Sequence, residues 1–306
     1  MRMAEGCFAA LATAIVLTLA LSLAACASTP ATIAPSAPGV VRVVAAENFW
    51  GDIAAQIGGA HVAVTSIITD PNVDPHTHES NPHDAAALSS AQLVIENGFG
   101  YDDFIDKLLA AGHRSGRTVL SIEKVLAIGG DNPNPHVWYD TAQLPAAVDA
   151  IRGALANADP ADAATFASNA KTFDDSLAPL LNTIAHIKTA YAGTAIAYTE
   201  RVPGYLVAAA GLVLGSPAGF SQAIEDGNDP SPGDTAAFDA AITDHQVKVL
   251  LYNSQVTDAQ TDKIRQLARK AGVPTVGVAE TIPKTDANFQ AWQLRQDNEL
   301  LAALGG

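Results

Sequence analysis

Short apolar runs alternate with amphipathic segments along the first half of the chain. Four runs rich in β-branched residues are predicted to be strands, at residues 40–47, 61–69, 93–98 and 118–122. Helices are predicted between them, at residues 49–59, 86–92 and 102–112. Repeated alternation of strand and helix is the signature of βαβ units, so this half is expected to contain a mostly parallel sheet.

The segment 159–190 has a different pattern. Apolar residues such as Phe166, Phe173 and Leu180 recur at helical spacing over its whole length. The Asp-Pro pair at residues 159–160 suits a helix start, and Pro179 is expected to kink the helix. The pattern predicts one long helix.

The alternation then resumes. Strands are predicted at residues 194–199, 247–253 and 273–278, and helices at 202–212, 234–246, 258–272 and 288–304. We therefore expect an α/β protein with two lobes of mostly parallel sheet flanked by helices. The lobes would span residues 40–158 and 191–306, bridged by the helix at 159–190.

The N-terminus is set apart by the apolar run 7–26, which follows Arg2 and ends in Ala24, Ala25 and Cys26. It resembles a bacterial lipoprotein signal, in which residues 1–25 are removed and the Cys26 thiol is lipidated. The alternative is an uncleaved membrane anchor, because 20 apolar residues can span a bilayer. Either way, the chain after it is expected outside the cytoplasm. Residues 26–39, small and proline-rich, would form a flexible tether.

Charge and cysteine content exclude several classes of function. The chain has 17 Lys and Arg against 32 Asp and Glu, a net charge of −15, which argues against a nucleic-acid partner. Its two cysteines are Cys7 and Cys26, so the mature chain would have neither a disulfide framework nor a thiolate metal site. A Walker A signature is absent from the sequence, so any ATPase would be a separate chain.

Polar residues that bind metals follow several of the predicted strands. His76 follows the strand 61–69, Glu200 follows 194–199, and Glu280 follows 273–278. His136 lies in a proline-framed loop that leads into a helix. Ligands of open α/β sheets bind just beyond the carboxyl ends of strands, and two imidazoles with two carboxylates suit Zn²⁺ or Mn²⁺.

The motifs around these residues resemble the metal-binding solute-binding proteins of ABC importers that carry zinc and manganese. The matching stretches are Asp74-Pro75-His76-Thr77-His78-Glu79, Asn134-Pro135-His136-Val137-Trp138-Tyr139-Asp140, Thr199-Glu200 and Ala279-Glu280. The resemblance extends over the body from about residue 40, including two lobes joined by one rigid helix. It implies His76, His136, Glu200 and Glu280 as metal ligands. Glu280 stands where the family usually has Asp, and Glu200 where many zinc proteins have His.

Other residues near these motifs are given supporting roles. His78, Glu79, Trp138 and Arg201 are candidates for the surroundings of the metal, and His83 is expected to be a surface residue. Arg201 also offers Glu200 a salt bridge, which is the competing role for that carboxylate. Glu280 has the rival role of a helix N-terminal acid, and Asp286 is a weaker substitute for it as a ligand.

The resemblance implies a lipid-anchored monomeric receptor that captures Zn²⁺ or Mn²⁺ between its lobes. It would deliver the metal to a permease driven by a separate ATPase. Zinc is favoured slightly, because it binds such a site at least as tightly as manganese. One alternative is an extracytoplasmic metal-dependent hydrolase with Glu79 as general base. Another is an adhesin-type lipoprotein with the same fold.

Overall fold

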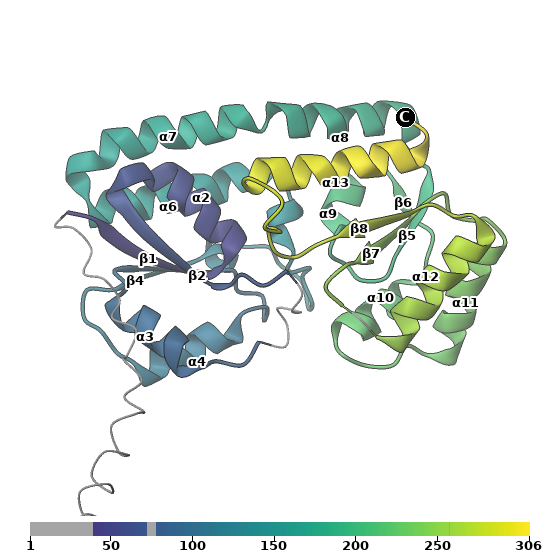
Figure 1. The fold of residues 1–306 in the computed structure, drawn as a ribbon, viewed down its shortest axis with the longest axis horizontal. Helices are drawn as coiled ribbons and strands as arrows, with labels where there is room; N and C mark the ends of the chain where they lie inside the picture. The colour runs from purple at the N-terminus through teal and green to yellow at the C-terminus, as the bar shows by residue number, and fades with distance from the viewer. Residues whose placement is uncertain (1–38, 72–77, 257) are drawn as a thin grey trace, which may run out of the picture. The chain divides into compact units, whose positions relative to one another are not determined.

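Two four-stranded parallel sheets organise the chain (Figure 1). The structure is a computed structural model and describes residues 39–71, 78–256 and 258–306. The predicted signal peptide, Cys26 and most of the tether therefore lie outside the described residues, as does His76. Residues 38–306 form one compact unit, and the α/β class expected from the sequence is confirmed.

The first sheet has the order β2-β1-β3-β4. Its strands are β1 (Val41–Glu47), β2 (Val62–Ile68), β3 (Leu93–Glu96) and β4 (Thr118–Ser121). Alternate residues of β1 face two separate cores: Val43 and Ala45 pack on one side, Val44 and Ala46 on the other. Burial on both faces explains why this strand is an almost continuous apolar run.

Helices cover both faces of the first sheet (Figure 1). One face packs against α2 (Asn48–Gly58) and α6 (Leu144–Ala158), the other against α3 (Pro82–Ser90) and α4 (Asp103–Ala111). Helix α3 begins before the predicted 86–92. The Asn81 side chain accepts from Asp84 N, and the Asp84 side chain accepts from Asn81 N. This capping box satisfies the first amides of the helix and fixes its start.

The expected single helix at 159–190 is two helices, so that detail of the prediction was wrong. A 3₁₀ turn, η4 (Pro160–Asp162), precedes α7 (Ala163–Ser176) and α8 (Ala178–Tyr191). The break falls at Leu177, and Pro179 lies in the first turn of α8. Proline lacks an amide hydrogen and its ring crowds the preceding turn, which explains the interruption. Phe173, Leu180 and Ile184 still form a continuous buried row.

The second sheet has the order β6-β5-β7-β8. Its strands are β5 (Ala195–Tyr198), β6 (Val213–Leu214), β7 (Leu250–Asn253) and β8 (Thr275–Val278). The edge strand β6 has two residues and was not predicted. The flanking helices are α9 (Gly204–Ala209), α10 (Ala218–Glu225), α11 (Pro232–Thr243), α12 (Ala259–Ala271) and α13 (Phe289–Leu304).

Short elements between β4 and α6 also escaped prediction. They are α5 (Ile122–Leu126) and the 3₁₀ turn η3 (Val137–Tyr139). Turn η3 directly follows His136, so a local turn orders the backbone next to this histidine.

The chain after β8 returns to the first half of the protein. The Asn48 side chain exchanges two hydrogen bonds of 2.9 Å with the backbone of Ile282. The Asp52 carboxylate accepts from Phe289 N at the start of α13, over 2.9 Å. Helix α13 then runs beside α8 (Figure 1). These contacts tie the C-terminal end of the second sheet to helix α2 of the first.

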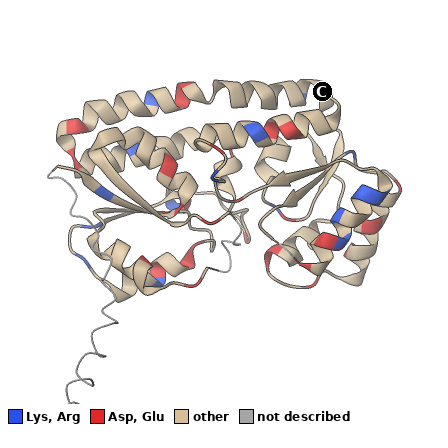
Figure 2. Ribbon diagram, viewed as in Figure 1, with Lys and Arg blue, Asp and Glu red and all other residues tan. Residues whose placement is uncertain are grey.

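Charged residues lie mainly on the helices and loops around the sheets (Figure 2). On α12, Lys263 pairs with Asp239 of α11 over 2.8 Å, and Arg265 pairs with Asp262 over 3.0 Å. Among the described residues, no helix is long and apolar enough to cross a membrane.

Candidate metal centre

Three polar side chains meet where the strands of the second sheet end. Glu200 follows β5, Asn253 is the last residue of β7, and Glu280 follows β8. Strand β7 lies between β5 and β8, so Asn253 lies between the two glutamates. Their exposed fractions are 2% for Glu200, 3% for Asn253 and 0% for Glu280. Two carboxylates buried this deeply need compensating donors or a cation.

Asn253 links the two carboxylates. Its Nδ2 donates to Glu200 Oε2 over 3.0 Å and also to Glu280 Oε1. The Asn253 Oδ1 accepts from Gln255 N over 3.0 Å. The amide therefore has its oxygen on a backbone donor and its nitrogen between two acids.

Glu280 is held in place through its own backbone. Gln255 Oε1 accepts from the amides of Glu280 and Thr281. The preceding residue, Ala279, donates to Gln296 Oε1 over 2.8 Å and accepts from the Tyr139 hydroxyl over 2.7 Å. These backbone hydrogen bonds at residues 279–281 fix the backbone position of Glu280.

His136 and Tyr101 reach Glu280 from the first half of the chain. His136 Nε2 lies 3.2 Å from Glu280 Oε2, and the Tyr101 hydroxyl donates to the same oxygen over 2.8 Å. The His136 ring is fully buried and packs edge-on against Trp138, with ring centroids 5.2 Å apart. The site is therefore built by segments that follow both sheets.

Asn134 determines which nitrogen of His136 can bind a metal. Asn134 Nδ2 donates to Arg201 O over 2.9 Å, so Oδ1 is the atom that faces His136. That oxygen accepts from His136 N and lies 2.6 Å from His136 Nδ1. Nδ1 therefore carries a hydrogen, which leaves Nε2, the nitrogen that faces Glu280, as the one available to a metal.

Three of the four predicted ligands, His136, Glu200 and Glu280, thus lie in one buried network. His76 lies outside the described residues. Glu280 lies nine residues before the start of α13 at Phe289, which argues against its competing role as a helix N-terminal acid. Arg201 pairs with Glu225 over 2.6 Å, and Asp286 pairs with Arg295 over 2.9 Å.

The residues expected around the site have different surroundings. Trp138 is buried and stacks on Phe49 with centroids 4.1 Å apart, forming a wall beside His136. His78 Nε2 lies 3.1 Å from Asp84 Oδ2, and its ring packs edge-on against Phe104. Glu79 and His83 are exposed. Arg201 contributes its carbonyl, which orients Asn134.

Four residues of this network were given no role from the sequence: Tyr101, Asn134, Asn253 and Gln255. Asn253 had a usable signal, because it also ends a predicted strand. Tyr101 lies five residues beyond β3 in a loop, where sequence gives no direction for the side chain. Neutral polar residues carry weaker chemical signals than histidines and acids, which explains the omission.

A second group of acids, Glu47, Glu96 and Asp102, lies at or just beyond the C-terminal ends of strands β1 and β3. Burial raises the pKa of Glu47 well above its usual value, and the charges of Asp102 and Glu96 add to this. Burial also raises the pKa of Asp102 to about 7, although the amides of Gly98 and Asn97 donate to it. Through these two hydrogen bonds, Asp102 fixes the loop that carries Tyr101.

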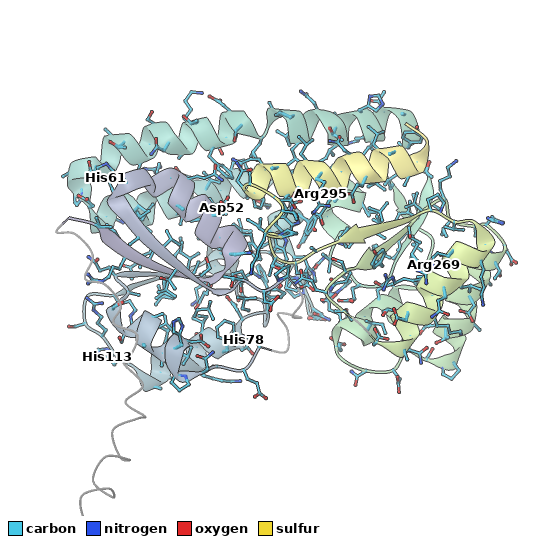
Figure 3. All side chains as sticks on the ribbon, in the orientation of Figure 1. Asp52, His61, His78, His113, Arg269 and Arg295 are labelled. Carbon is cyan, nitrogen blue, oxygen red and sulfur yellow. The ribbon has the colours of Figure 1, made fainter. Side chains whose placement is uncertain are left out.

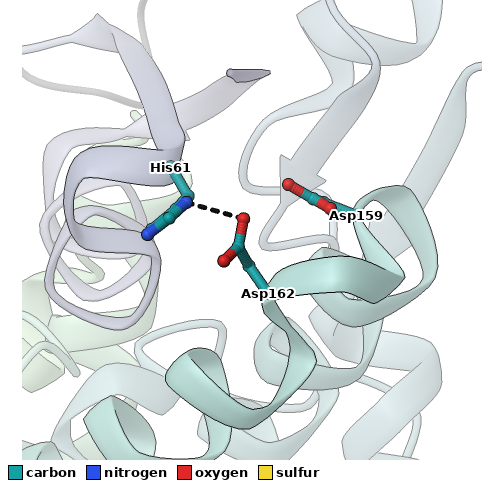
Figure 4. Close-up of side chains that lie close together, drawn as sticks. All are labelled: His61, Asp159 and Asp162. Carbon is teal, nitrogen blue, oxygen red and sulfur yellow. Dashed lines mark ion pairs between the residues drawn. The ribbon is translucent and has the colours of Figure 1, made fainter. Parts of the chain in front are cut away.

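A third group, His61, Asp159 and Asp162, lies where the turn before β2 meets the turn before α7 (Figure 4). Their potential ligand atoms lie within 4.8 Å of one another. His61 Nδ1 pairs with Asp162 Oδ2 over 2.7 Å, and the Asp159 side chain accepts from Ala161 N over 3.2 Å. An ion pair and a helix cap account for this group.

Comparison with known proteins identifies relatives over most of the chain. The manganese-binding lipoprotein MntA of Bacillus subtilis is 27% identical over 249 residues, covering 78% of each chain. The iron-binding protein YfeA of Yersinia pestis is 30% identical over 162 residues, which cover 48% of this chain and 50% of YfeA.

Solved structures share the fold. The periplasmic zinc binding protein TroA from Treponema pallidum superposes with a TM-score of 0.75, at 18% identity, over 88% of this chain and all of TroA. FpvC from Pseudomonas aeruginosa in complex with Mn²⁺ gives a TM-score of 0.73 at 19% identity, over 87% of this chain and 98% of FpvC.

A family model described as "Zinc-uptake complex component A periplasmic" matches residues 43–303, which include Glu200, Glu280 and His136. The match spans both sheets and the helices that join them. The chain therefore belongs to this family of metal-binding solute-binding proteins of ABC importers, which are not enzymes.

Proposed function

We propose that this protein binds one divalent transition metal through His76, His136, Glu200 and Glu280. The observation that carries the proposal is the meeting of His136 Nε2 and Glu280 Oε2, 3.2 Å apart and fully buried. They come from segments 144 residues apart that follow different sheets. An imidazole nitrogen and a carboxylate oxygen held at this separation could both bind the same metal ion.

The charge of this donor set suits a divalent cation. Glu200 and Glu280 supply two negative charges in a buried site, and a 2+ ion neutralises both. Neutral imidazoles add donors without adding charge. A metal bound there contacts both halves of the chain, so its binding and release would be coupled to the relative position of the halves.

Zinc is the proposed cargo, with manganese as the second candidate. Sites of mixed imidazole and carboxylate bind Zn²⁺ more tightly than Mn²⁺ under the Irving–Williams order. The named relatives include manganese-binding and iron-binding proteins, so the family uses this fold for several divalent metals.

Delivery of the metal would require an ABC permease and its ATPase, which the family implies. We propose that the protein is held at the outer side of the cell membrane by a lipid on Cys26. The receptor would be a monomer formed by the lobes 40–158 and 191–306 and the helical linker 159–190. Residues 26–39 would form a tether long enough to let this receptor reach the permease. Relatives named as lipoproteins support this arrangement.

The ligand set is tested by substitution and metal retention. His136→Ala and His76→Ala should each abolish stoichiometric retention of Zn²⁺ and Mn²⁺ while the far-UV circular dichroism spectrum is unchanged. His113→Ala is the matched control, because this histidine is exposed beside α4 (Figure 3). Full affinity in the first two variants would refute the site. Elemental analysis of the protein isolated from its native membrane would identify the transported metal. Metal titration of Glu280→Asp would show how the extra methylene of Glu280 affects metal affinity.

A further inference from the structure

Asn48 reaches the backbone beside Glu280 from the first half of the chain. It is the first residue of α2 and directly follows β1, so it lies at the C-terminal end of that strand. Its Nδ2 donates to Ile282 O and its Oδ1 accepts from Ile282 N, both over 2.9 Å. One side-chain amide therefore pairs with both backbone groups of the residue two positions after Glu280.

The backbone around Glu280 is held by side-chain amides. The segment 279–288, between β8 and α13, forms neither helix nor strand. Four consecutive backbone amides at its start nevertheless have acceptors, as buried amides require. The acceptors are Gln296 for residue 279, Gln255 for residues 280 and 281, and Asn48 for residue 282. Asn48 is the only one of these three acceptors that belongs to the first half of the chain.

This arrangement matters because Glu280 has no regular secondary structure to support it. The side chains that bind a metal have to be held within about 0.5 Å of their productive positions by the residues around them. Gln255 and Gln296 hold the backbone of Glu280 from its own half. Asn48 adds a link to the helix that follows the central strand β1 of the first sheet.

Asn48 belongs to a row of polar residues on one face of α2. Asn48, Asp52 and Gln56 are spaced four residues apart, so their side chains project from the same face. Asp52 accepts from Phe289 N over 2.9 Å, and the side chains of Gln56 and Gln290 exchange two hydrogen bonds of 2.9 Å. All three residues hold the chain after β8, but only Asn48 does so next to a proposed ligand. Gln56 therefore provides a matched control.

We propose that Asn48 is a positioning residue for Glu280, an inference that rests on the proposed function. By holding both backbone groups of Ile282, Asn48 ties the position of this ligand to helix α2 in the opposite half. Without Asn48, the backbone after Glu280 loses two hydrogen bonds and can shift. A bound metal should then have a changed coordination geometry and leave the site faster.

The test compares Asn48→Ala with Gln56→Ala, using Co²⁺ as the probe metal. Each substitution removes two hydrogen bonds between α2 and the chain after β8, so both metal-free proteins should melt at lower temperatures. Asn48→Ala should also release Co²⁺ to a chelator about tenfold faster or more, with a changed visible spectrum. Gln56→Ala should keep the release rate and the spectrum of the unsubstituted protein.

Three results would overturn the inference. The first is an unchanged release rate in folded Asn48→Ala. The second is equally fast release in both variants, which would show that α2 only holds the halves together. The third is faster release from Asn48→Ala with an unchanged cobalt spectrum, because the geometry of the site would then be intact.

Two further controls keep the test decisive. If Asn48→Ala does not fold, Asn48→Ser replaces it, because its single hydroxyl cannot pair with both Ile282 N and Ile282 O. The same faster release and changed spectrum are expected for Asn48→Ser, and their absence would refute the role of Asn48. Failure of the unsubstituted protein to retain any metal would instead refute the proposed function.

Discussion

The Tyr101 hydroxyl donates to Glu280 Oε2 over 2.8 Å, across 179 residues of sequence. Tyr101 lies in the loop after the third strand of the first sheet, and Glu280 follows the last strand of the second. The bond therefore joins the two halves of the chain at the proposed ligand itself. Asp102, the next residue, anchors this loop through the amides of Asn97 and Gly98.

Tyr101→Phe should weaken metal retention by speeding release. The substitution removes one hydrogen bond to a buried carboxylate, a contact worth about 1.5–3 kcal/mol. The phenyl ring keeps the packing against Trp138, so the fold should be preserved. Stopped-flow release of metal to a chelator measures the effect, and a release rate equal to that of the unsubstituted protein would contradict it.

Asn134→Ala should lower metal affinity by about 10–100-fold. Without the Asn134 oxygen, the His136 ring loses the acceptor that keeps hydrogen on Nδ1 and lone pair on Nε2. Chelator competition measures the affinity. Asn132→Ala is a control in the same loop, because the Asn132 side chain makes only a 3.5 Å contact with Arg201. Equal affinities in the two variants would show that Asn134 does not act through the histidine.

His78→Ala should leave metal stoichiometry and affinity unchanged. The His78 side chain contacts Asp84 and Phe104 of the neighbouring helices, and its loss removes a partly buried pair. A melting temperature of the metal-free protein lower by roughly 2–4 °C is expected. A large loss of affinity with an unchanged melting temperature would instead place His78 among the ligands.

The stability of the metal-free protein should fall as pH rises from about 4 through 7. The raised pKa values of Glu47 and Asp102 mean that the folded protein keeps protons that the unfolded chain has already lost. Each such group lowers the free energy of unfolding by up to about 1.4 kcal/mol per pH unit in this window. Urea denaturation at pH 5 to 8, with chelator present, measures the slope.

Glu47→Gln should flatten that slope. Glutamine keeps the shape of Glu47 but does not titrate. Asp229→Asn, at an exposed position, should leave the slope unchanged. Identical slopes in all three proteins would mean that the buried acids do not control the pH dependence.

The elements could be predicted from sequence wherever the local pattern was strong. Strand β1 and helix α13 agree with prediction to within one residue. Strand β6 was missed because two residues are too few to show an alternating pattern of apolar and polar positions. Its pairing depends on the neighbouring strand β5. The break at Leu177 lies two residues before Pro179, which the sequence displays, yet apolar residues at helical spacing continue across it.

The sequence by itself determined the chemistry available: which strand ends carry acids, and which loops carry histidines. Tertiary structure alone decided the arrangement, because strand order is set by packing rather than by chain order. Placing β7 between β5 and β8 puts Asn253 between Glu200 and Glu280. Contacts such as Tyr101 with Glu280 depend on how the two halves pack, and no local pattern encodes a distance across 179 residues.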